Sequence, residues 1–171
     1  MATSIAASGA TPAEPETDVA PPRDGVIRWA VTVGLLTFTL SVAVAALAVL
    51  VKIPVETRPG TTVFETLSAT TAFAPAFDTL IGQSLTITIV GWFTNSTAWK
   101  VWVSALVFGL LHIGHSPATA VVVALTSGPL LAYTCVRWER SSPARAYFAT
   151  TLTDLVHNGC AYAIGLLALV S

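Results

Sequence analysis

The chain has 171 residues, of which 54% are hydrophobic and 10% charged, and its formal net charge is −1. Soluble domains carry about 25% charged residues, so this chain lacks the polar surface needed to cover itself in water. Its mean hydropathy of +0.74 agrees with that. The composition predicts an integral membrane protein with the lipid bilayer as its partner. The near-neutral charge and the lack of a basic cluster exclude a nucleic-acid-binding protein.

The first 25 residues differ in composition from the rest of the chain. Residues 1–25 are rich in Ala, Pro, Thr and acidic residues. They cannot bury enough apolar surface to offset the entropy lost on ordering, so we expect a disordered N-terminal tail. They also lack the basic region followed at once by an apolar core that marks a secretory signal peptide. Residues 26–171 are expected to form one transmembrane helical domain.

About five apolar segments are candidates to cross a hydrocarbon core about 30 Å thick. Backbone groups in lipid must be paired within each segment, so helices are the expected form. The fold class is therefore expected to be all-α, a polytopic transmembrane bundle. A mildly amphipathic stretch at 62–75 either lies at the interface or extends the second span, and Pro75 and Pro129 are expected to kink their helices. The five spans are residues 29–51, 76–93, 98–116, 117–136 and 143–170.

The basic residues set the expected orientation. With the N-terminus in the cytoplasm, only Lys52 and Arg58 lie outside, as the positive-inside rule favours. The basic residues then on the cytoplasmic side are Arg23, Arg28, Lys100, Arg137, Arg140 and Arg145.

Several polar side chains fall within the predicted spans. An ionisable group at membrane depth costs roughly 2.5–3.5 kcal/mol on insertion scales, so such groups usually face one another or a wet cavity. Residues three or four apart share one face of a helix, which predicts that three helices direct these groups to a common interior. A purely structural polar network is the alternative. The residues are Asp78, Gln83, His112, His115, Asp154, His157 and Asn158.

Three of these residues are candidate metal ligands. His112, His115 and His157, together with a carboxylate, would be a reasonable set of ligands for a divalent ion such as zinc. A divalent metal is therefore the one cofactor that we expect from the residue types.

Two stretches resemble a known family. Phe108-Gly-Leu-Leu-His112, within "SALVFGLLHIG", matches a Phe-x-x-x-His motif near the end of a helix. Further on, "LLAYTCVRWERSSPARAYFATTLTDLVHNG" is similar to a basic turn followed by a final catalytic helix. Residues 74–168 thus resemble the CPBP intramembrane proteases, the family of the type II CAAX prenyl endopeptidases and of the bacteriocin-processing and immunity-type membrane proteases.

The chain departs from the family pattern in its first and last motifs. Where the family has a Glu pair with an Arg five residues after the first Glu, this chain has Phe77 and Asp78, with Gly82 at the Arg position. Where the family has His-x-x-x-Asn, this chain has Asp154 and Asn158, with His157 one turn away.

The resemblance implies an intramembrane endopeptidase, a metalloprotease-like hydrolase that cleaves membrane-associated or prenylated peptides. By its motifs, Asp78 would be the general base that activates water, and His112 would hold the water or bind a metal. Asn158 would donate a hydrogen bond to the oxyanion, and Asp154 or His157 would complete the site. A base near the water and a donor where negative charge develops are what such hydrolysis requires.

Two other functions remain open. The loss of the Glu pair favours a degenerate relative that binds a membrane-associated peptide or protein without cleaving it. A serine protease of the rhomboid type would use Ser127 and His157, since a Ser–His dyad suffices for acyl transfer. In that family, however, a Gly stands two residues before the Ser, where this chain has Leu125.

Overall fold

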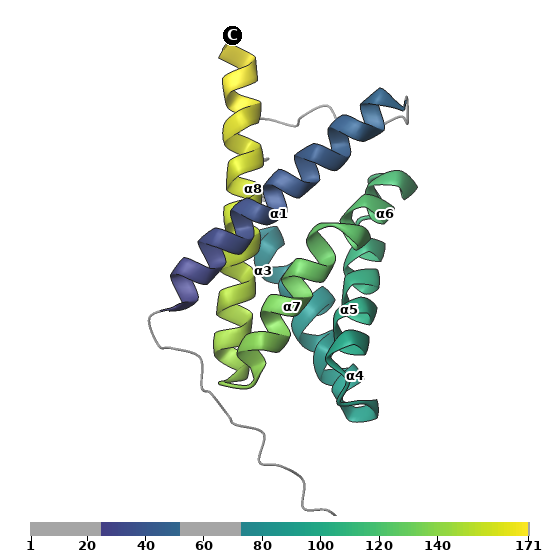
Figure 1. The fold of residues 1–171 in the computed structure, drawn as a ribbon, viewed down its shortest axis with the longest axis vertical. Helices are drawn as coiled ribbons and strands as arrows, with labels where there is room; N and C mark the ends of the chain where they lie inside the picture. Colours follow the sequence, from purple (N-terminus) through teal and green to yellow (C-terminus); the bar gives the residue numbers. More distant parts are fainter. Residues whose placement is uncertain (1–24, 52–72, 171) are drawn as a thin grey trace, which may run out of the picture.

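A computed structural model of the chain describes residues 25–51 and 73–170 (Figure 1). Within these residues the fold is all-α, as predicted. The predicted tail, the basic residues Arg23, Lys52 and Arg58, and nearly all of the 62–75 stretch lie outside the described residues.

The helices follow the apolar segments closely. The first and last predicted spans correspond to α1 and α8, and the second corresponds to a helix built from three consecutive pieces, α3, η2 and α4. The bounds are α1 Gly25–Leu50, α3 Ala74–Asp78, the π-helix η2 Thr79–Leu85, α4 Thr86–Phe93, α5 Thr97–Leu111, α6 Pro117–Leu125, α7 Ser127–Glu139 and α8 Pro143–Val170.

Serine caps begin two of the helices. The Ser96 hydroxyl accepts a hydrogen bond from the backbone N–H of Trp99 at the start of α5. The Ser116 hydroxyl accepts from the N–H of Thr119 at 3.0 Å at the start of α6, where Pro117 occupies the first turn. Serine at the N-cap and proline in the first turn both favour a helix start, because each deals with N–H groups that have no partner within the helix.

The third predicted span ends earlier than expected. We predicted a helix over 98–116, but α5 stops at Leu111 and His112 is its C-cap, with φ −92° and ψ 1°. The backbone of His112–His115 forms a turn, in which the N–H of His115 donates to the carbonyl of His112 at 3.0 Å. Pro117 is incompatible with a helix that continues to residue 116, because it has no N–H to donate to the carbonyl of Ile113 and disfavours helical backbone at Ser116. The prediction that His112 and His115 share one helix face was therefore wrong.

The fourth predicted span is divided into two helices. α6 and α7 meet at Thr126 and are bent by 42°. Pro129 explains the break, because it has no N–H to donate to the carbonyl of Leu125 and its ring crowds that carbonyl. The predicted kink at Pro129 is confirmed, but α7 continues to Glu139, beyond the predicted end at Val136.

The helices pack around α7, η2 and the first half of α8. In Figure 1, α1 crosses α8, and α7 lies between α8 and α5. The α1–α8 crossing needs the glycine at Gly34, because a Cβ there would lie 2.7 Å from the Cβ of Val156. Small residues at such crossings are typical of helices that pack without water. η2 contacts α5, α7 and α8, so its polar side chains lie inside the bundle.

The described basic residues gather at one end of the bundle, where α1 begins and where the α4–α5 and α7–α8 turns lie (Figure 1). There, Lys100 Nζ lies 3.3 Å from Glu139 Oε2. The guanidinium of Arg137 lies 4.4 Å from the ring centre of Trp29. The prediction placed these basic residues on one side of the membrane, and their position at one end of the bundle agrees with that. They are Arg28, Lys100, Arg137, Arg140 and Arg145.

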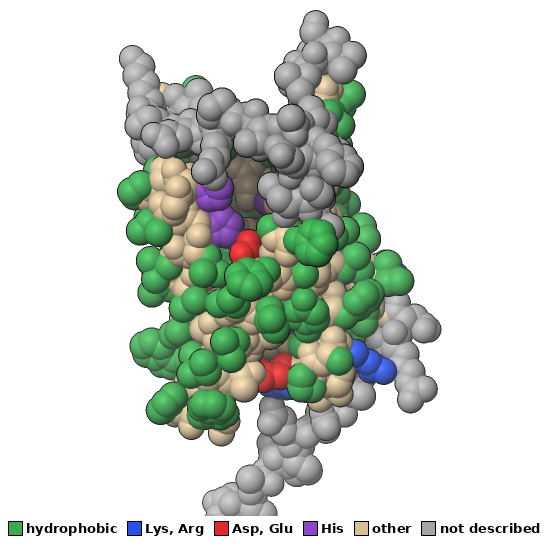
Figure 2. Space-filling model, turned by 180° about the vertical axis from the view of Figure 1, so that it is seen from behind, with side chains coloured by type: hydrophobic (Ala, Val, Ile, Leu, Met, Phe, Trp, Pro, Cys, Tyr) green, Lys and Arg blue, Asp and Glu red, His purple; other side chains and the backbone are tan. Residues whose placement is uncertain are grey.

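Large apolar side chains lie mostly on the outside (Figure 2). Leu50, Trp92 and Phe93 are 78%, 75% and 84% exposed. The buried positions include many Ala, Thr and Ser residues instead. This is the reverse of a water-soluble core, and an apolar surface of this size is expected to face lipid or a partner.

Among the helices that the structure describes, one is long and apolar enough to cross a membrane, by length and composition alone. It is Gly25–Ala48 in α1, and the bent pair α6–α7 qualifies as a second span when its halves are taken together. α5 is apolar but has only 15 residues. One or two such helices are weak evidence, because buried core helices and signal sequences pass the same test, although only 22% of the window in α1 is buried.

Candidate functional site

Asp78 is positioned by an unusual stretch of helix. It is the last residue of α3, and η2 begins at the next residue. In a π-helix each N–H bonds to the carbonyl five residues earlier, which is rare and often occurs at functional sites. The Thr86 hydroxyl supports this stretch by donating to the carbonyl of Ile81 at 2.9 Å. No pattern in the sequence predicts the π-helix.

The ring of His112 is held by a backbone carbonyl one turn earlier in the chain. Its Nδ1 lies 2.9 Å from the carbonyl oxygen of Phe108, and its ring centre lies 4.9 Å from that of Phe108. A carbonyl oxygen only accepts, so Nδ1 must carry the hydrogen. In the neutral ring, Nε2 then has a free lone pair and is able to accept a proton. The two residues of the Phe-x-x-x-His motif are therefore coupled through the Phe108 carbonyl as well as through their rings.

His115 lies beside His112, with their ring centres 6.0 Å apart. It is exposed, whereas Asp78 and His112 are partly buried. The Asp78 carboxylate interacts electrostatically with both imidazoles. Figure 2 shows histidine side chains around a hollow, with a carboxylate at its edge. The turn after α5 thus brings its two histidines to the acid at the end of α3.

Helix α8 contributes the third part of the cluster. Asp154 is buried, and its Oδ1 accepts a hydrogen bond from Asn158 Nδ2 at 3.3 Å. Asp154 interacts electrostatically with Asp78, and His157 with His112. The ring of His157 packs edge-on against that of Phe38 in α1, with the ring centres 6.1 Å apart. Its Nδ1 is buried without a hydrogen-bond partner among the described residues.

Electrostatic interactions thus connect the predicted catalytic residues from three separate segments, although within 25–51 and 73–170 no ion pair joins one of these acids to an imidazole. We call these residues the acid–imidazole cluster, and their catalytic roles stay predictions. Its members are Asp78, His112, Asp154, His157 and Asn158, with His115 at its exposed edge.

The residues do not fit the predicted metal. Within 25–51 and 73–170, no three His, Cys, Asp or Glu side chains come together in a way that would hold a metal ion. His112, His115 and His157 are each near another member of the cluster, but the three do not form one ligand set. We therefore assign no step to a metal.

The Ser–His dyad of the rhomboid alternative is not formed. The buried Ser127 hydroxyl donates to the carbonyl of Val123 at 3.5 Å, one turn earlier in the chain. His157 contacts Phe38, and no hydrogen bond joins it to Ser127 in the part of the chain that the structure describes. The small Ser127 side chain fits a packing role next to the α6–α7 break.

The position at Gly82, where the resemblance would place an arginine, is closed to a large side chain. A Cβ on Gly82 would lie 2.9 Å from Cδ2 of Phe108, so η2 and α5 touch at this point. The next residue, Gln83, is fully buried, and its Oε1 accepts a hydrogen bond from the Ser104 hydroxyl. Gln83 stands out in the sequence as a polar residue within a span. Ser104 carries no such signal, because a lone serine in an apolar helix is common.

Neither a scan of protein-family models nor searches of curated proteins and of solved structures found a match to this chain. The resemblance to the CPBP proteases therefore stays a prediction that rests on the motifs quoted above.

Proposed function

We propose that the chain is an integral membrane endopeptidase that activates water at the acid–imidazole cluster. The observation that carries this proposal is that the His112 ring is held by the Phe108 carbonyl with Nε2 unpaired, within range of an electrostatic interaction with the Asp78 carboxylate. A second acid, a third imidazole and an amide lie around this pair. An acid, an imidazole and an amide together provide the base, the charge stabilisation and the donor that hydrolysis of an amide bond needs.

The resemblance implied Asp78 as the base, but we assign that role to His112, supported by Asp78, because the Phe108 carbonyl holds the His112 ring with Nε2 unpaired. His112 Nε2 removes a proton from water while the oxygen attacks the carbonyl carbon of the peptide bond. Asp78 stabilises the imidazolium that forms, as a carboxylate beside a catalytic histidine does in other hydrolases. The same proton then passes to the leaving nitrogen as the C–N bond breaks, so His112 returns to its neutral form. The proton count therefore closes without a metal or another cofactor.

The amide of Asn158 is the donor assigned to the developing oxyanion. One of its two Nδ2 hydrogens is directed to Asp154, which fixes the amide orientation. The other hydrogen is the one assigned to substrate. An amide held in place before the reaction stabilises negative charge better than a mobile one, because no reorganisation is needed during the reaction.

The membrane location is part of the proposal. The exposed large apolar side chains and the small, polar interior support a helical bundle embedded in lipid. The charged residues at the α4–α5 and α7–α8 turns support an orientation with that end in the cytoplasm. The proposed substrates are consequently membrane-associated peptides, including prenylated ones.

Hydrolysis in H₂¹⁸O tests this function. The full chain, purified in detergent and reconstituted in phospholipid vesicles, is given a set of prenylated and unprenylated membrane peptides, and the products are analysed by mass spectrometry. The proposal predicts a shorter product with one ¹⁸O atom in its new carboxyl terminus. If the protein is correctly folded and every peptide stays intact, the proposal is contradicted.

A second candidate is a protein that binds such peptides without cleaving them. Two observations favour this candidate. Gly82 has no room for a larger side chain against Phe108, and the Asn158 amide already donates a hydrogen bond to Asp154. Photocrosslinking of the same peptides separates the two functions. Capture by the wild-type chain without an ¹⁸O-labelled product would support binding alone, whereas a labelled product would exclude it.

A further inference from the structure

The helical segment around Asp78 is held by side-chain hydroxyls from neighbouring helices. Within the described residues, only two hydroxyls donate to a backbone carbonyl of another helix, and both carbonyls lie in α3 or η2. The Tyr147 hydroxyl of α8 donates to the carbonyl of Ala76 at 3.1 Å. The Ser104 hydroxyl of α5 donates to the carbonyl of Gly82 at 2.7 Å. The segment that carries Asp78 is therefore tied to both α8 and α5.

A π-helix needs such partners more than an α-helix does. Its N–H groups bond to the carbonyl five residues earlier, whereas those of the α-helices on either side bond to the carbonyl four residues earlier. Because the two patterns differ by one residue, the backbone groups cannot all pair with one another where one pattern passes into the other. Side-chain hydroxyls take up carbonyls of η2 instead. Thr86 donates to Ile81 at 2.9 Å, and Ser104 shares its hydrogen between the Gly82 carbonyl and the Gln83 amide oxygen.

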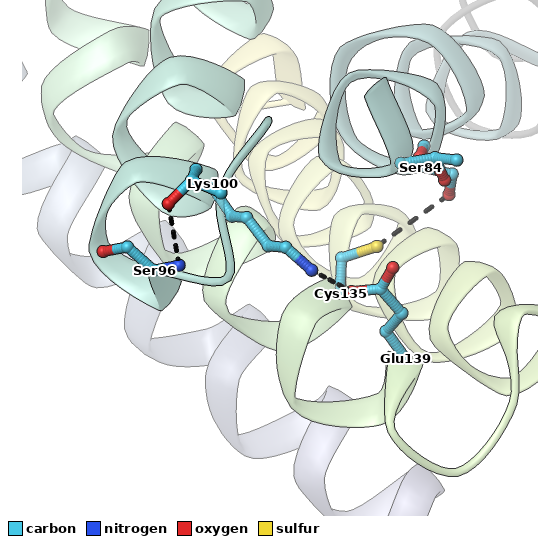
Figure 3. A network of polar contacts seen from close by, with 7 residues as sticks. Ser84, Ser96, Lys100, Cys135 and Glu139 are labelled. Atoms are coloured by element: carbon cyan, nitrogen blue, oxygen red, sulfur yellow. Dashed lines mark hydrogen bonds and ion pairs between the residues drawn. The ribbon is translucent and has the colours of Figure 1, made fainter. Parts of the chain in front are cut away.

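The end of η2 that lies away from Asp78 is held by α7. The Ser84 hydroxyl lies 3.9 Å from the Sγ atom of Cys135, a weak hydrogen bond that Figure 3 shows. Three helices thus hold the π-helical stretch, with α8 just before it, α5 within it and α7 near its end. Because no local sequence pattern specifies the stretch, these contacts between helices determine where it lies.

Tyr147 lies on the same face of α8 as two members of the acid–imidazole cluster. Residues seven and eleven positions apart are two and three turns apart on one helix face, and Asp154 and Asn158 follow Tyr147 at these spacings. The carbonyl that accepts from Tyr147 belongs to Ala76, two residues before Asp78. The Tyr147 hydroxyl therefore joins the face of α8 that carries one acid of the cluster to the end of α3 that carries the other.

We propose that Tyr147 is a positioning residue, whose hydroxyl holds the end of α3 against α8 so that Asp78 keeps its place in the acid–imidazole cluster. Tyr147 takes no part in the proposed proton transfer and acts through the acid. A catalytic group misplaced by about 1 Å can cost on the order of 100-fold in rate. The effect of Tyr147 on turnover rests on the proposed hydrolysis, whereas its hydrogen bond to Ala76 does not.

Two substitutions of the same kind on α8 test this role. Tyr147→Phe and Tyr162→Phe each remove one hydroxyl and keep the ring. The Tyr162 hydroxyl is buried without a hydrogen-bond partner among the described residues, so Tyr162→Phe is the matched control. Release of the ¹⁸O-labelled product by the reconstituted full chain should fall about tenfold in kcat in Tyr147→Phe, with KM unchanged because no substrate contact is removed. Tyr162→Phe should stay within a few-fold of the wild type, and equal kcat in Tyr147→Phe and the wild type would overturn the proposal.

A double-mutant cycle separates positioning from general destabilisation. If Tyr147 acts through Asp78, Tyr147→Phe should have almost no further effect on kcat once Asp78→Asn has removed the carboxylate, because the effects of coupled residues are not additive. A tyrosine that only stabilises the fold would instead lower kcat by the same factor in the wild-type and Asp78→Asn backgrounds. That result would overturn the proposal.

Carbonyl NMR of the full chain in detergent tests the hydrogen bond without any turnover. Labelling with carbonyl-¹³C alanine and ¹⁵N phenylalanine selects the alanines that precede a phenylalanine, which are Ala72 and Ala76. Phe73→Leu removes the signal of Ala72 and leaves that of Ala76. In this background the Ala76 resonance should move upfield in Tyr147→Phe, because its carbonyl loses a donor, and should stay in place in Tyr162→Phe.

The NMR result also separates a failure of this inference from a failure of the proposed hydrolysis. An Ala76 resonance that does not move in Tyr147→Phe would overturn the inference even if the chain cleaves peptides. A resonance that moves, in a chain that cleaves no peptide, would contradict the hydrolysis and still support Tyr147 as the residue that holds α3 against α8.

Discussion

Gly82 of η2 and Phe108 of α5 are in such close contact that a single added methyl group would not fit between them. A Cβ on Gly82 would lie 2.9 Å from Cδ2 and 3.3 Å from Cα of Phe108. Phe108 is also the residue whose carbonyl holds His112. The glycine therefore sets how closely α5, and with it His112, approaches Asp78.

Gly82→Ala should destabilise the protein and disturb the site. Forcing an extra methyl group into a packed contact costs about 1–3 kcal/mol, which should lower the melting temperature in detergent. Gly159→Ala is the matched control, because a Cβ there meets nothing within 4 Å. Alanine is a better helix former than glycine by roughly 0.5–1 kcal/mol, so the control should be slightly stabilised. Equal melting temperatures for the two variants would contradict the close η2–α5 contact.

His112→Ala and His115→Ala should have very different effects on cleavage. His112 is held by Phe108 and partly buried, whereas His115 is exposed in the turn. Loss of a general base lowers the turnover rate by about 10²–10⁴-fold, so His112→Ala should be nearly inactive. His115→Ala should lose only severalfold, because His115 takes no part in the proposed proton transfer. Turnover is measured as the release of the ¹⁸O-labelled product, and similar losses in both variants would argue against the role given to His112.

Chelation should leave turnover unchanged. The described residues do not form a metal-binding group, and the proposed proton transfers need none. The measurement is turnover after dialysis against EDTA, with elemental analysis of the same sample. A loss of activity that zinc restores would show that the proton-transfer account is wrong and that the metal predicted from the histidines is present.

The outward-facing apolar side chains should be in lipid. Leu106 of α5 is 58% exposed, while Arg145 lies at the charged end of the bundle. A spin label at Leu106→Cys should be accessible to oxygen, which concentrates in the bilayer, and one at Arg145→Cys to a water-soluble nickel complex. Both variants are made with Ala at the two native cysteines and measured in vesicles by power-saturation EPR. Greater nickel accessibility at position 106 than at 145 would contradict the membrane location.

The extent of the helices could be predicted from the sequence because apolar runs and capping residues act locally. Ser116 and Pro117 mark the start of α6. Pro129 predicts the bend between α6 and α7. The prediction extended this helix past Leu111 because the three-residue spacing of His112 and His115 fits a helix, although Gly114 and Pro117 are signals that the helix would stop. The helical spacing of Asp154 and Asn158 correctly predicted that they share a face.

The rest of the site depends on contacts between distant segments. The π-helix over Thr79–Leu85 has no local sequence signal, and it determines which side chains of this stretch face inward. The contact between Ser104 and Gln83 joins residues 21 positions apart, and the electrostatic contact of Asp78 with His112 spans 34. Spacing within one helix predicts which residues share a face. Which faces of two helices contact each other depends on packing between them, as between Gly82 of η2 and Phe108 of α5.

The most direct test of the proposed hydrolysis compares two acidic residues at different places in the bundle. Asp78→Asn removes the charge beside His112, and Glu139→Gln removes the charge paired with Lys100 at the opposite end. Turnover of a membrane peptide by the reconstituted protein should fall by at least about 100-fold in Asp78→Asn, as expected for the loss of a group that supports the base. Glu139→Gln should retain turnover within a few-fold of the wild type. Equal turnover in Asp78→Asn and the wild type would contradict the catalytic role of the acid–imidazole cluster.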